Sequence, residues 1–441
     1  MEIKVVSDEI IKLSSKSATK ESIWLSVLDV CQPKVYVNFC YFFKNDGTDG
    51  SFSVKKMIDG LKVTLQEYPE VCGSIEYTTS GGVLNFDNHG VKLINSKANF
   101  SFKDVEAVGF EIEKLPEKDI FLPELQGFLL AKDAFLFIAQ IISLTDDSLM
   151  LVVSFHHVLS DAHGIFRFMN AWASATKHGH VGTYSNNTDR SLLVGNGEKP
   201  TSLLDRGYIS LTGPPPQMPS LGKMSKYEFF ISFAKLDSLK ERFSEDLPGN
   251  MYLSKNDILT AIIWKATVAA RVQKKCETTM IATVVNSRKR FGLPEGYFGN
   301  CVPYLCKRLP VKDVLNMSLK ETCLLLRKNY DVMSKNYVQD LMNWLQNQES
   351  LMSIMPSVNI FTNDLLFSSL AQHPMYECDF GLGKAHLIQP GGGPMLPGLI
   401  WIFPTPENDG LRFQYCLTAE EMAEFLANDY VMDTIDIVRK I

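Results

Sequence analysis

A strand that ends in two histidines and leads directly into a helix constrains the fold of this chain more than any other segment. The apolar run from Leu149 to Val153 predicts a buried strand, and Ser154-Phe-His-His-Val-Leu-Ser-Asp-Ala-His-Gly continues it. Apolar residues then recur at helical spacing up to Ala175, which predicts a helix that begins near Asp161. The fold must therefore pack a strand and a helix together at this junction.

The polar residues of the junction allow three interpretations. His156, His157, Asp161 and His163 are satisfied structural residues, or a metal site, or a general base with its supporting acid. Adjacent residues of a strand point to opposite faces, so His156 and His157 do not easily share one ion, and we expect no metal. Imidazole titrates near neutrality, so His157 can take a proton from an alcohol or amine while Asp161 fixes the junction. From these residues alone, the structural and the general-base interpretations are equally supported.

Two other segments carry residues of chemical interest. Val285-Asn-Ser-Arg-Lys-Arg290 is either a solvated basic strand end or a site where Arg288 reaches a buried carboxylate and its neighbours contact phosphate. Asp379-Phe-Gly-Leu-Gly-Lys384 contains glycines that a tight turn would explain. No strand-then-helix context around it supports a phosphate-binding loop.

The length of the chain, 441 residues, exceeds one ordinary core and predicts two domains. Periodic patterns stop between about His178 and Pro219, and a connection this long indicates a crossover between two lobes. We predict an N-terminal lobe over residues 1–180, a crossover over 181–222 and a C-terminal lobe over 223–441. Expected elements are a helix over 54–65, strands over 134–142, 148–155, 227–233 and 280–286, a helix over 256–272 capped by Asn256 or Asp257, and hairpins over 73–86 and 399–417.

Charge and cysteine usage exclude some classes of protein. A formal net charge of −6 leaves no basic field for nucleic acid. The nine cysteines are scattered without a C-x-x-C pair, which favours reduced thiols in the cytosol. No apolar run approaches the ~20 residues of a membrane span, and the first residues lack the pattern of a signal peptide. We expect a cytoplasmic monomer without a membrane span or a nucleic-acid partner.

Taken in order, these segments resemble the BAHD family of acyl-CoA-dependent acyltransferases. His157 to Asp161 match its H-x-x-x-D element, and Asp379-Phe-Gly-Leu-Gly matches its D-F-G-W-G element. Tyr297-Phe-Gly-Asn, Asn286-Ser-Arg, Leu25-Ser-Val-Leu-Asp and the helix that starts at Ser254 match further family segments, so the resemblance covers essentially the whole chain. Leu382 stands where most plant members have Trp, which is closer in style to fungal trichothecene O-acetyltransferase-like members.

The resemblance implies a fold and a reaction. The fold is mixed α/β and two-lobed, like that of chloramphenicol acetyltransferase, with a helix-packed mixed sheet in each lobe and a tunnel between them. Acyl-CoA is a co-substrate, and no permanently bound cofactor is implied. The reaction moves an acyl group, with acetyl as the plainest choice, from CoA to a hydroxyl or amine of a small molecule.

The resemblance also implies roles for individual residues. His157 is the general base, and Asp161 is its structural partner through a pair with Arg288. Arg288, Asp379, Gly381 and Gly383 give structural support, and Ser254, Lys255, Lys289 and Arg290 are candidates for binding CoA. With Leu382 at the Trp position, a backbone N–H, a hydroxyl or water must stabilise the oxyanion.

Two alternatives keep the same fold. The first is a non-catalytic protein that binds acyl-CoA or a small molecule, motivated by Leu382 and by the altered Asp161-Ala-His-Gly segment. The second is a condensation-type acyltransferase that takes its acyl group from a carrier protein, because the His-His-x-x-x-Asp pattern also resembles such domains. Binding of CoA without transfer to any acceptor would favour the first alternative, and a comparison of acyl-CoA with acyl-carrier donors tests the second.

Overall fold

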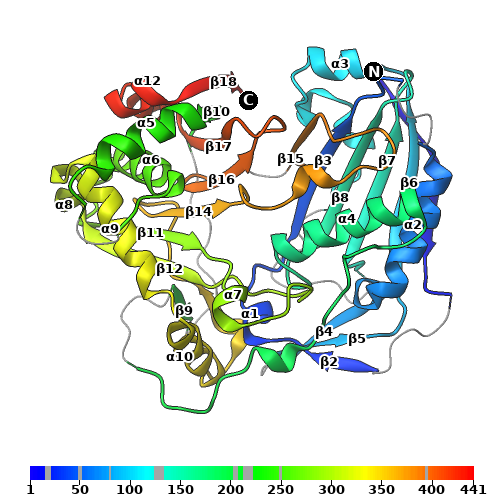
Figure 1. Cartoon of the computed structure of the whole chain (residues 1–441), viewed down its shortest axis with the longest axis horizontal. Helices are drawn as coiled ribbons and strands as arrows, with labels where there is room; N and C mark the ends of the chain where they lie inside the picture. Colours follow the sequence, from blue (N-terminus) through cyan, green and yellow to red (C-terminus); the bar gives the residue numbers. More distant parts are fainter. Residues whose placement is uncertain are drawn as a thin grey trace.

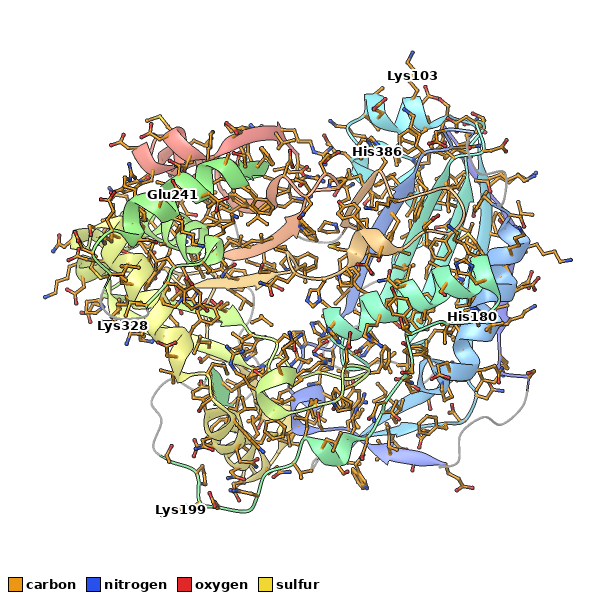
Figure 2. All side chains as sticks on the ribbon, in the orientation of Figure 1. Lys103, His180, Lys199, Glu241, Lys328 and His386 are labelled. Atoms are coloured by element: carbon orange, nitrogen blue, oxygen red, sulfur yellow. The ribbon has the colours of Figure 1, made fainter. Side chains whose placement is uncertain are left out.

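Two large β-sheets, each covered by helices, lie side by side in the computed structural model of the chain (Figure 1). The structure describes residues 1–14, 21–47, 52–78, 81–123, 134–201, 207–211, 222–247, 251–392 and 396–441. Side chains fill both halves, and the labelled Lys103 and Lys199 lie at the outer edge of the molecule (Figure 2). This arrangement confirms the predicted mixed α/β fold with two helix-packed sheets.

The first sheet carries the strand with the two histidines. Its apolar residues alternate between two cores because neighbouring side chains of a strand point to opposite faces. Phe155 packs on the helix side, with its ring 5.3 Å from that of Phe168, whereas Met150 and Val152 belong to the core on the other face. The helices α2 (Val54–Glu67) and α4 (Ala162–His178) cover one face of the sheet, and α3 (Phe102–Ala107) lies on the other side. In sheet order the strands are β1 (Ile3–Ile11), β6 (Val91–Ala98), β7 (Phe137–Ser143), β8 (Leu149–His156), β3 (Tyr36–Phe43) and β15 (Leu387–Pro390).

The second sheet packs against α6 (Lys255–Ala270), a helix whose residues are nearly all buried and mostly apolar. Trp264 in this helix donates to the Thr279 hydroxyl at 3.1 Å. The strands in order are β12 (Tyr304–Pro310), β11 (Thr278–Val284), β14 (Leu365–Ser369), β16 (Leu399–Pro404), β17 (Gly410–Thr418), β10 (Met224–Ser232) and β18 (Asp436–Lys440), and the other helices here are α5 (Phe233–Ser244), α8 (Val311–Asn316), α9 (Leu319–Val332), α11 (Ala419–Leu426) and α12 (Asp429–Thr434).

Smaller elements fill the lower part of the view in Figure 1. They are the three-stranded sheet β2 (Ser22–Trp24), β5 (Gly81–Asn85) and β4 (Ser74–Thr78), the strand pair β9 (Tyr208–Ser210) and β13 (Ile354–Pro356), and the helices α1 (Val27–Val30), α7 (Arg288–Phe291) and α10 (Lys335–Gln346). The described part of the chain holds no helix that is long and apolar enough to cross a membrane.

Two features differ from the sequence expectations. The cap of α6 is Ser254, not Asn256 or Asp257: the Ser254 hydroxyl accepts the Asp257 N–H, and the Asp257 carboxylate accepts the Ser254 N–H. This reciprocal capping box satisfies two exposed donors, which explains why the helix starts earlier. In addition, β15 comes from the 223–441 range yet pairs with β3 in the first sheet. The chain therefore returns from the second sheet to complete the first.

Candidate active site

The site lies at the junction between the end of β8 and the start of α4. His157 follows the last residue of β8, and its N–H donates to the Val35 carbonyl at 2.9 Å, which extends the pairing with β3 by one residue. Asp161 is the N-cap of α4 rather than a residue of its first turn, since its side chain accepts the N–H groups of His163 and Gly164 at 3.1 and 3.4 Å. A capping carboxylate suits this position because free N–H groups and the positive end of the helix dipole meet there.

Asp161 forms a buried, two-pronged ion pair with Arg288. Its two oxygens accept from the guanidinium at 2.8 and 2.9 Å, and the two residues are 2% and 4% exposed. Burial alone would raise the pKa of Asp161, but Arg288 and the Cys301 N–H at 2.9 Å hold that pKa below its usual value. The carboxylate is therefore ionised and its hydrogen bonds are all made within the protein, so it has no lone pair left for a substrate.

The same arginine holds the loop that follows α7. Arg288 donates to the carbonyls of Tyr297 at 3.3 Å and Gly299 at 2.6 Å. Between them, the Phe298 carbonyl accepts from Arg190, which approaches the loop from another part of the chain. Gly299 is required by this contact, because a Cβ there would lie 2.6 Å from the centre of the Arg190 guanidinium.

Arg190 belongs to a second buried ion pair, which the sequence analysis missed. Its Nε donates to Asp29 at 3.0 Å, and its remaining N–H group reaches the Leu159 carbonyl at 3.2 Å. Asp29 also accepts the backbone and side-chain N–H groups of Asn300 at 2.7 and 2.9 Å. The Asn300 amide then donates to the His157 carbonyl at 3.0 Å, so this second pair fixes the backbone of the histidine itself.

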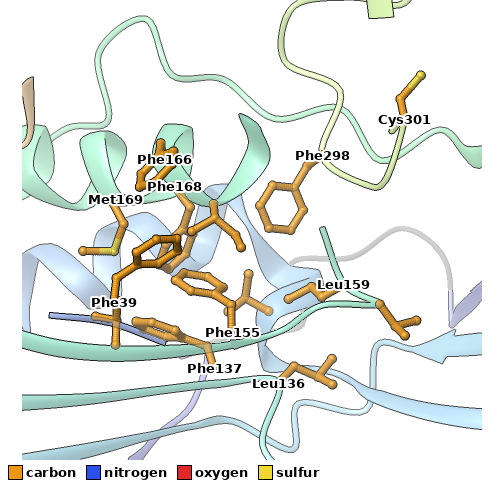
Figure 3. Packing of buried hydrophobic residues seen from close by; sticks show 14 of the residues in the cluster. Phe39, Leu136, Phe137, Phe155, Leu159, Phe166, Phe168, Met169, Phe298 and Cys301 are labelled. Atoms are coloured by element: carbon orange, nitrogen blue, oxygen red, sulfur yellow. The ribbon is translucent and has the colours of Figure 1, made fainter. Parts of the chain in front are cut away.

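Apolar packing secures the loop from the other side. Phe298 points its ring toward the core between β8 and α4, near Phe155 and Leu159 (Figure 3). The ring lies 5.2 Å from that of Tyr68. Gly164 in the first turn of α4 allows this approach, since a Cβ there would lie 2.9 Å from the Phe298 ring.

The imidazole of His157 is half-buried and uncharged. Burial lowers its pKa, against the opposing effects of its own carbonyl and of Asp161. Its Nδ1 lies out of contact with solvent, which leaves Nε2 as the nitrogen that a substrate can meet. A neutral histidine in this setting can accept a proton.

Two more histidines lie nearby. Nε2 of His163 donates to the Glu295 carbonyl at 3.0 Å, which links the first turn of α4 to the loop after α7. Its ring is 6.1 Å from that of His373, which lies in the connection between β14 and β15. Burial lowers the pKa of His373 to about 4. His373 could not be predicted as a site residue, because a lone histidine in an irregular segment has no recognisable pattern.

The glycine-rich segment lies away from His157. Asp379 pairs with Lys177 at 2.6 Å, and Lys177 is near the C-terminal end of α4, about 24 Å along the helix from Asp161. Phe380 packs its ring 5.0 Å from that of Trp172. Gly381 and Gly383 have φ angles of +101° and +79°, which an L side chain rarely adopts. This segment attaches the returning chain to the first lobe, and Leu382 replaces Trp at a place remote from the histidine.

The predicted CoA-binding residues form a separate group in the second lobe. Ser254 is a helix cap, and Lys255 forms an ion pair with Asp237 at 2.9 Å. Lys289 and Arg290 are exposed, directly after Arg288. Burial raises the pKa of Tyr330 to about 12, against a small opposing effect of the nearby Arg290. The Tyr330 hydroxyl accepts from Asn256 at 3.4 Å, so the basic segment and the start of α6 share one side of the lobe. No group of three or more potential metal ligands occurs among the described residues.

Known proteins align with nearly all of this chain. The sequence model of the Transferase family matches residues 1–432. Rosmarinate synthase of Plectranthus scutellarioides is 24% identical over 422 residues, which are 94% of this chain and 95% of that protein. Shikimate O-hydroxycinnamoyltransferase of Nicotiana tabacum is 24% identical over 442 residues, with 96% and 98% covered.

Solved structures show the same fold. TRI101 of F. sporotrichioides, complexed with coenzyme A and T-2, superposes with a TM-score of 0.80 at 17% identity and covers 95% of this chain and 100% of its own. Vinorine synthase superposes with a TM-score of 0.73 at 18% identity, with 99% of both chains covered. The chain therefore belongs to the Transferase family, the BAHD family of acyl-CoA-dependent acyltransferases.

Proposed function

We propose that this enzyme transfers an acyl group from acyl-CoA to a hydroxyl or amine of a small molecule, with His157 as the general base. The observation that carries the proposal is a neutral imidazole whose backbone is fixed on both sides. The N–H of His157 is bonded to Val35, and its carbonyl is bonded to Asn300. Such fixation holds Nε2 in place for direct attack of the acceptor on the thioester.

The step balances without a covalent enzyme intermediate. His157 removes the proton of the acceptor as the acceptor oxygen or nitrogen forms a bond to the thioester carbon. The tetrahedral intermediate then collapses, the carbon–sulfur bond breaks, and the imidazolium returns the proton to the CoA thiolate. General-base assistance supplies roughly 10²–10⁴-fold, and alignment of the two substrates adds to it.

Asp161 acts in this proposal as a positioning residue. Both of its oxygens are engaged by Arg288, Cys301 and the start of α4. It therefore shapes the junction that presents His157 and does not relay the proton. Asn300 holds the His157 carbonyl, and Arg190 holds the Leu159 carbonyl two residues later.

The anionic end of CoA fits the basic side of the second lobe. Lys289 and Arg290 are exposed and have no carboxylate partner among the described residues, so they are free to meet phosphates. Lys255 and Ser254 lie at the start of α6, where free N–H groups add to the positive potential. We propose that Lys289 and Arg290 make the main contacts and that Lys255 must leave Asp237 to take part.

A thiol-release assay tests the proposal. Purified protein is incubated with acetyl-CoA, the first choice, or with hydroxycinnamoyl-CoA or benzoyl-CoA, which the names of relatives suggest. Shikimate, tryptamine and a trichothecene alcohol serve as acceptors. We expect acceptor-dependent release of free thiol that His157→Ala lowers at least a hundredfold while thermal stability is kept. Turnover that survives in His157→Ala contradicts the role of the base, and CoA binding without any turnover favours the non-catalytic alternative.

The cellular setting follows from the thiols and is also a proposal. All nine cysteines are unpaired, and eight of them are buried. We propose a monomer that works in the reducing cytoplasm, with the lobe boundaries at about residues 180 and 223. Light scattering of the purified protein measures its mass and tests the monomer.

A further inference from the structure

The ring of Tyr297 meets two guanidinium groups, one from each buried ion pair beside His157. The Cζ atom of Arg190 lies over the ring at 5.4 Å from its centre, and the Cζ atom of Arg288 lies over it at 5.6 Å. The negative face of an aromatic ring attracts a cation within about 6 Å, and more strongly where water is excluded. Tyr297 is 0% exposed, and both arginines are buried. One side chain therefore attracts the cations of both pairs.

The backbone of Tyr297 is fixed on both sides by Asn187. The Asn187 N–H donates to the Gly296 carbonyl at 2.9 Å, and the Phe298 N–H donates to the Asn187 carbonyl at 2.8 Å. Gly296 allows this close pairing, because a Cβ there would lie 2.6 Å from the Ser185 carbonyl oxygen. The ring is thus attached to a backbone that is held in place, whereas the two arginines reach it with long, rotatable side chains.

The contact uses the face of the ring and not its hydroxyl. The Tyr297 hydroxyl is buried and has no hydrogen-bond partner among the described residues. Burial raises its pKa above the usual value even though Arg190 and Arg288 oppose this effect, so the side chain stays neutral between its two cations. A buried hydroxyl without a partner is unfavourable. The structure therefore gains from the aromatic face alone, which phenylalanine would supply equally well.

The two cations hold different parts of the segment that contains the proposed base. Arg190 donates to the Leu159 carbonyl and to Asp29, and Asp29 acts on the His157 carbonyl through an asparagine. Arg288 pairs with Asp161, where α4 begins. Guanidinium groups of like charge repel each other, and a ring that attracts both opposes that repulsion. The spacing of the two pairs then depends on the ring.

We propose that Tyr297 is a positioning residue of the acyl transfer, because its ring face fixes the spacing of Arg190 and Arg288 and so holds His157 in one orientation. This inference rests on the proposed function, since it concerns the base of that reaction. In this role Tyr297 acts through the two arginines and makes no contact with a substrate. The two ion pairs consequently behave as one unit and not as separate supports.

NMR of histidine labelled with carbon-13 at Cε1 tests the orientation of the base without any turnover. The chain has eight histidines, and the signal that His157→Ala removes belongs to the base. We expect one sharp signal in the parent protein and in Tyr297→Phe, and a broadened or split signal in Tyr297→Leu. In the thiol-release assay, we expect Tyr297→Leu to lower kcat about ten- to hundredfold and to leave the KM for acyl-CoA within about twofold, because the base is misplaced.

Tyr41→Leu is the matched control for the loss of a buried ring. Tyr41 is also 0% exposed, and its hydroxyl also has no partner among the described residues, but its ring stacks on that of Phe43 at 6.2 Å. We expect Tyr41→Leu to lower the melting temperature about as much as Tyr297→Leu does, and to keep both kcat and the sharp His157 signal. A purely structural role of Tyr297 would make the two variants alike.

Tyr297→pentafluorophenylalanine, introduced by amber suppression, separates the charge of the ring face from its shape. Fluorination keeps a ring of similar size and reverses the sign of its face, so the attraction for both cations is lost. We expect this variant to behave like Tyr297→Leu, and it decides the matter if Tyr297→Leu does not fold. A parent-like signal and kcat in either of these two variants overturn the inference, as does a loss of both in Tyr297→Phe. If the parent protein turns over no acceptor, the proposed reaction fails, while the NMR comparison still decides whether the ring fixes the histidine.

Discussion

The two buried aspartates beside His157 are alike in burial yet do different work. Asp161 receives both prongs of Arg288 and caps α4, so it fixes where the helix begins. Asp29 receives one nitrogen of Arg190 and both N–H groups of Asn300, which carries the constraint to the His157 carbonyl. One pair therefore sets the helix and the other sets the histidine backbone. The structural role of each ion pair next to His157 is therefore given by the groups that its remaining hydrogen bonds fix in place.

A third pair shows the opposite extreme. Lys177 and Asp379 have side chains that are 29% and 25% exposed, and water can replace either partner. Ion pairs of this kind contribute little, because solvent screens them and two long side chains must be ordered. Breaking either buried pair should therefore cost more free energy of unfolding than breaking the exposed Lys177–Asp379 pair.

The largest effect is expected for Asp161→Ala. The change leaves the buried Arg288 guanidinium without its carboxylate and removes the cap of α4. We expect a loss of about 3–5 kcal/mol in the free energy of unfolding, measured with urea, and a loss of thiol release. The matched double variant Asp161→Ala/Arg288→Met is expected to recover part of the stability. Wild-type stability of the single variant would contradict the importance of this pair.

The second prediction uses the pH dependence of stability to test the surroundings of the Asp29–Arg190 pair. Burial raises the pKa of Glu70, which lies near Arg190, from 4.5 to about 7. Because the folded state favours the protonated acid, its contribution is intact below pH 4.5 and is lost as the pH rises to about 7. Glu70→Gln is therefore expected to stabilise the protein by ~3 kcal/mol at pH 8 and to change little at pH 4.5. Urea unfolding at both pH values measures this, and a stabilisation equal at both would exclude titration of Glu70.

The third prediction concerns the link between the second pair and the histidine. Asn300→Ala removes donors to Asp29 and to the His157 carbonyl, so we expect a loss of about 1–3 kcal/mol in stability. The turnover number is expected to fall more than the KM for acyl-CoA changes, because the proposed base His157 is misplaced while the proposed CoA-binding residues in the second lobe are untouched. A change confined to the KM for acyl-CoA would argue against this role of Asn300.

The smallest effect is expected for the exposed pair. Lys177→Ala leaves Asp379 in contact with water and with the Gly381 N–H at 2.8 Å. We expect a stability change of about 0–1 kcal/mol and unchanged turnover. A loss as large as that of Asp161→Ala would show that this pair is more important than its exposure indicates.

The sequence was sufficient for residues that lie in ordered motifs. His157, Asp161 and Arg288 meet in the structure because a strand end, a helix cap and a short helix each place one of them. Arg190 could not be found, since it lies in a crossover without periodicity and its partner Asp29 is 161 positions away. The membership of β15 was hidden for the same reason: a four-residue strand carries no signal of the sheet it joins. Residues 202–206 and 212–221 of the predicted crossover lie outside the described residues.

The late arrival of β15 matters for how the chain is made. During synthesis β3, which is rich in aromatic residues, emerges as the edge of the first sheet, and its partner is encoded more than 340 residues later. At ~5–20 residues per second the ribosome needs roughly 20–70 s to supply that strand. For this time an apolar edge is open to pairing with other nascent chains. The first lobe therefore keeps an unpaired strand edge until residues 387–390, in the last eighth of the chain, have been translated.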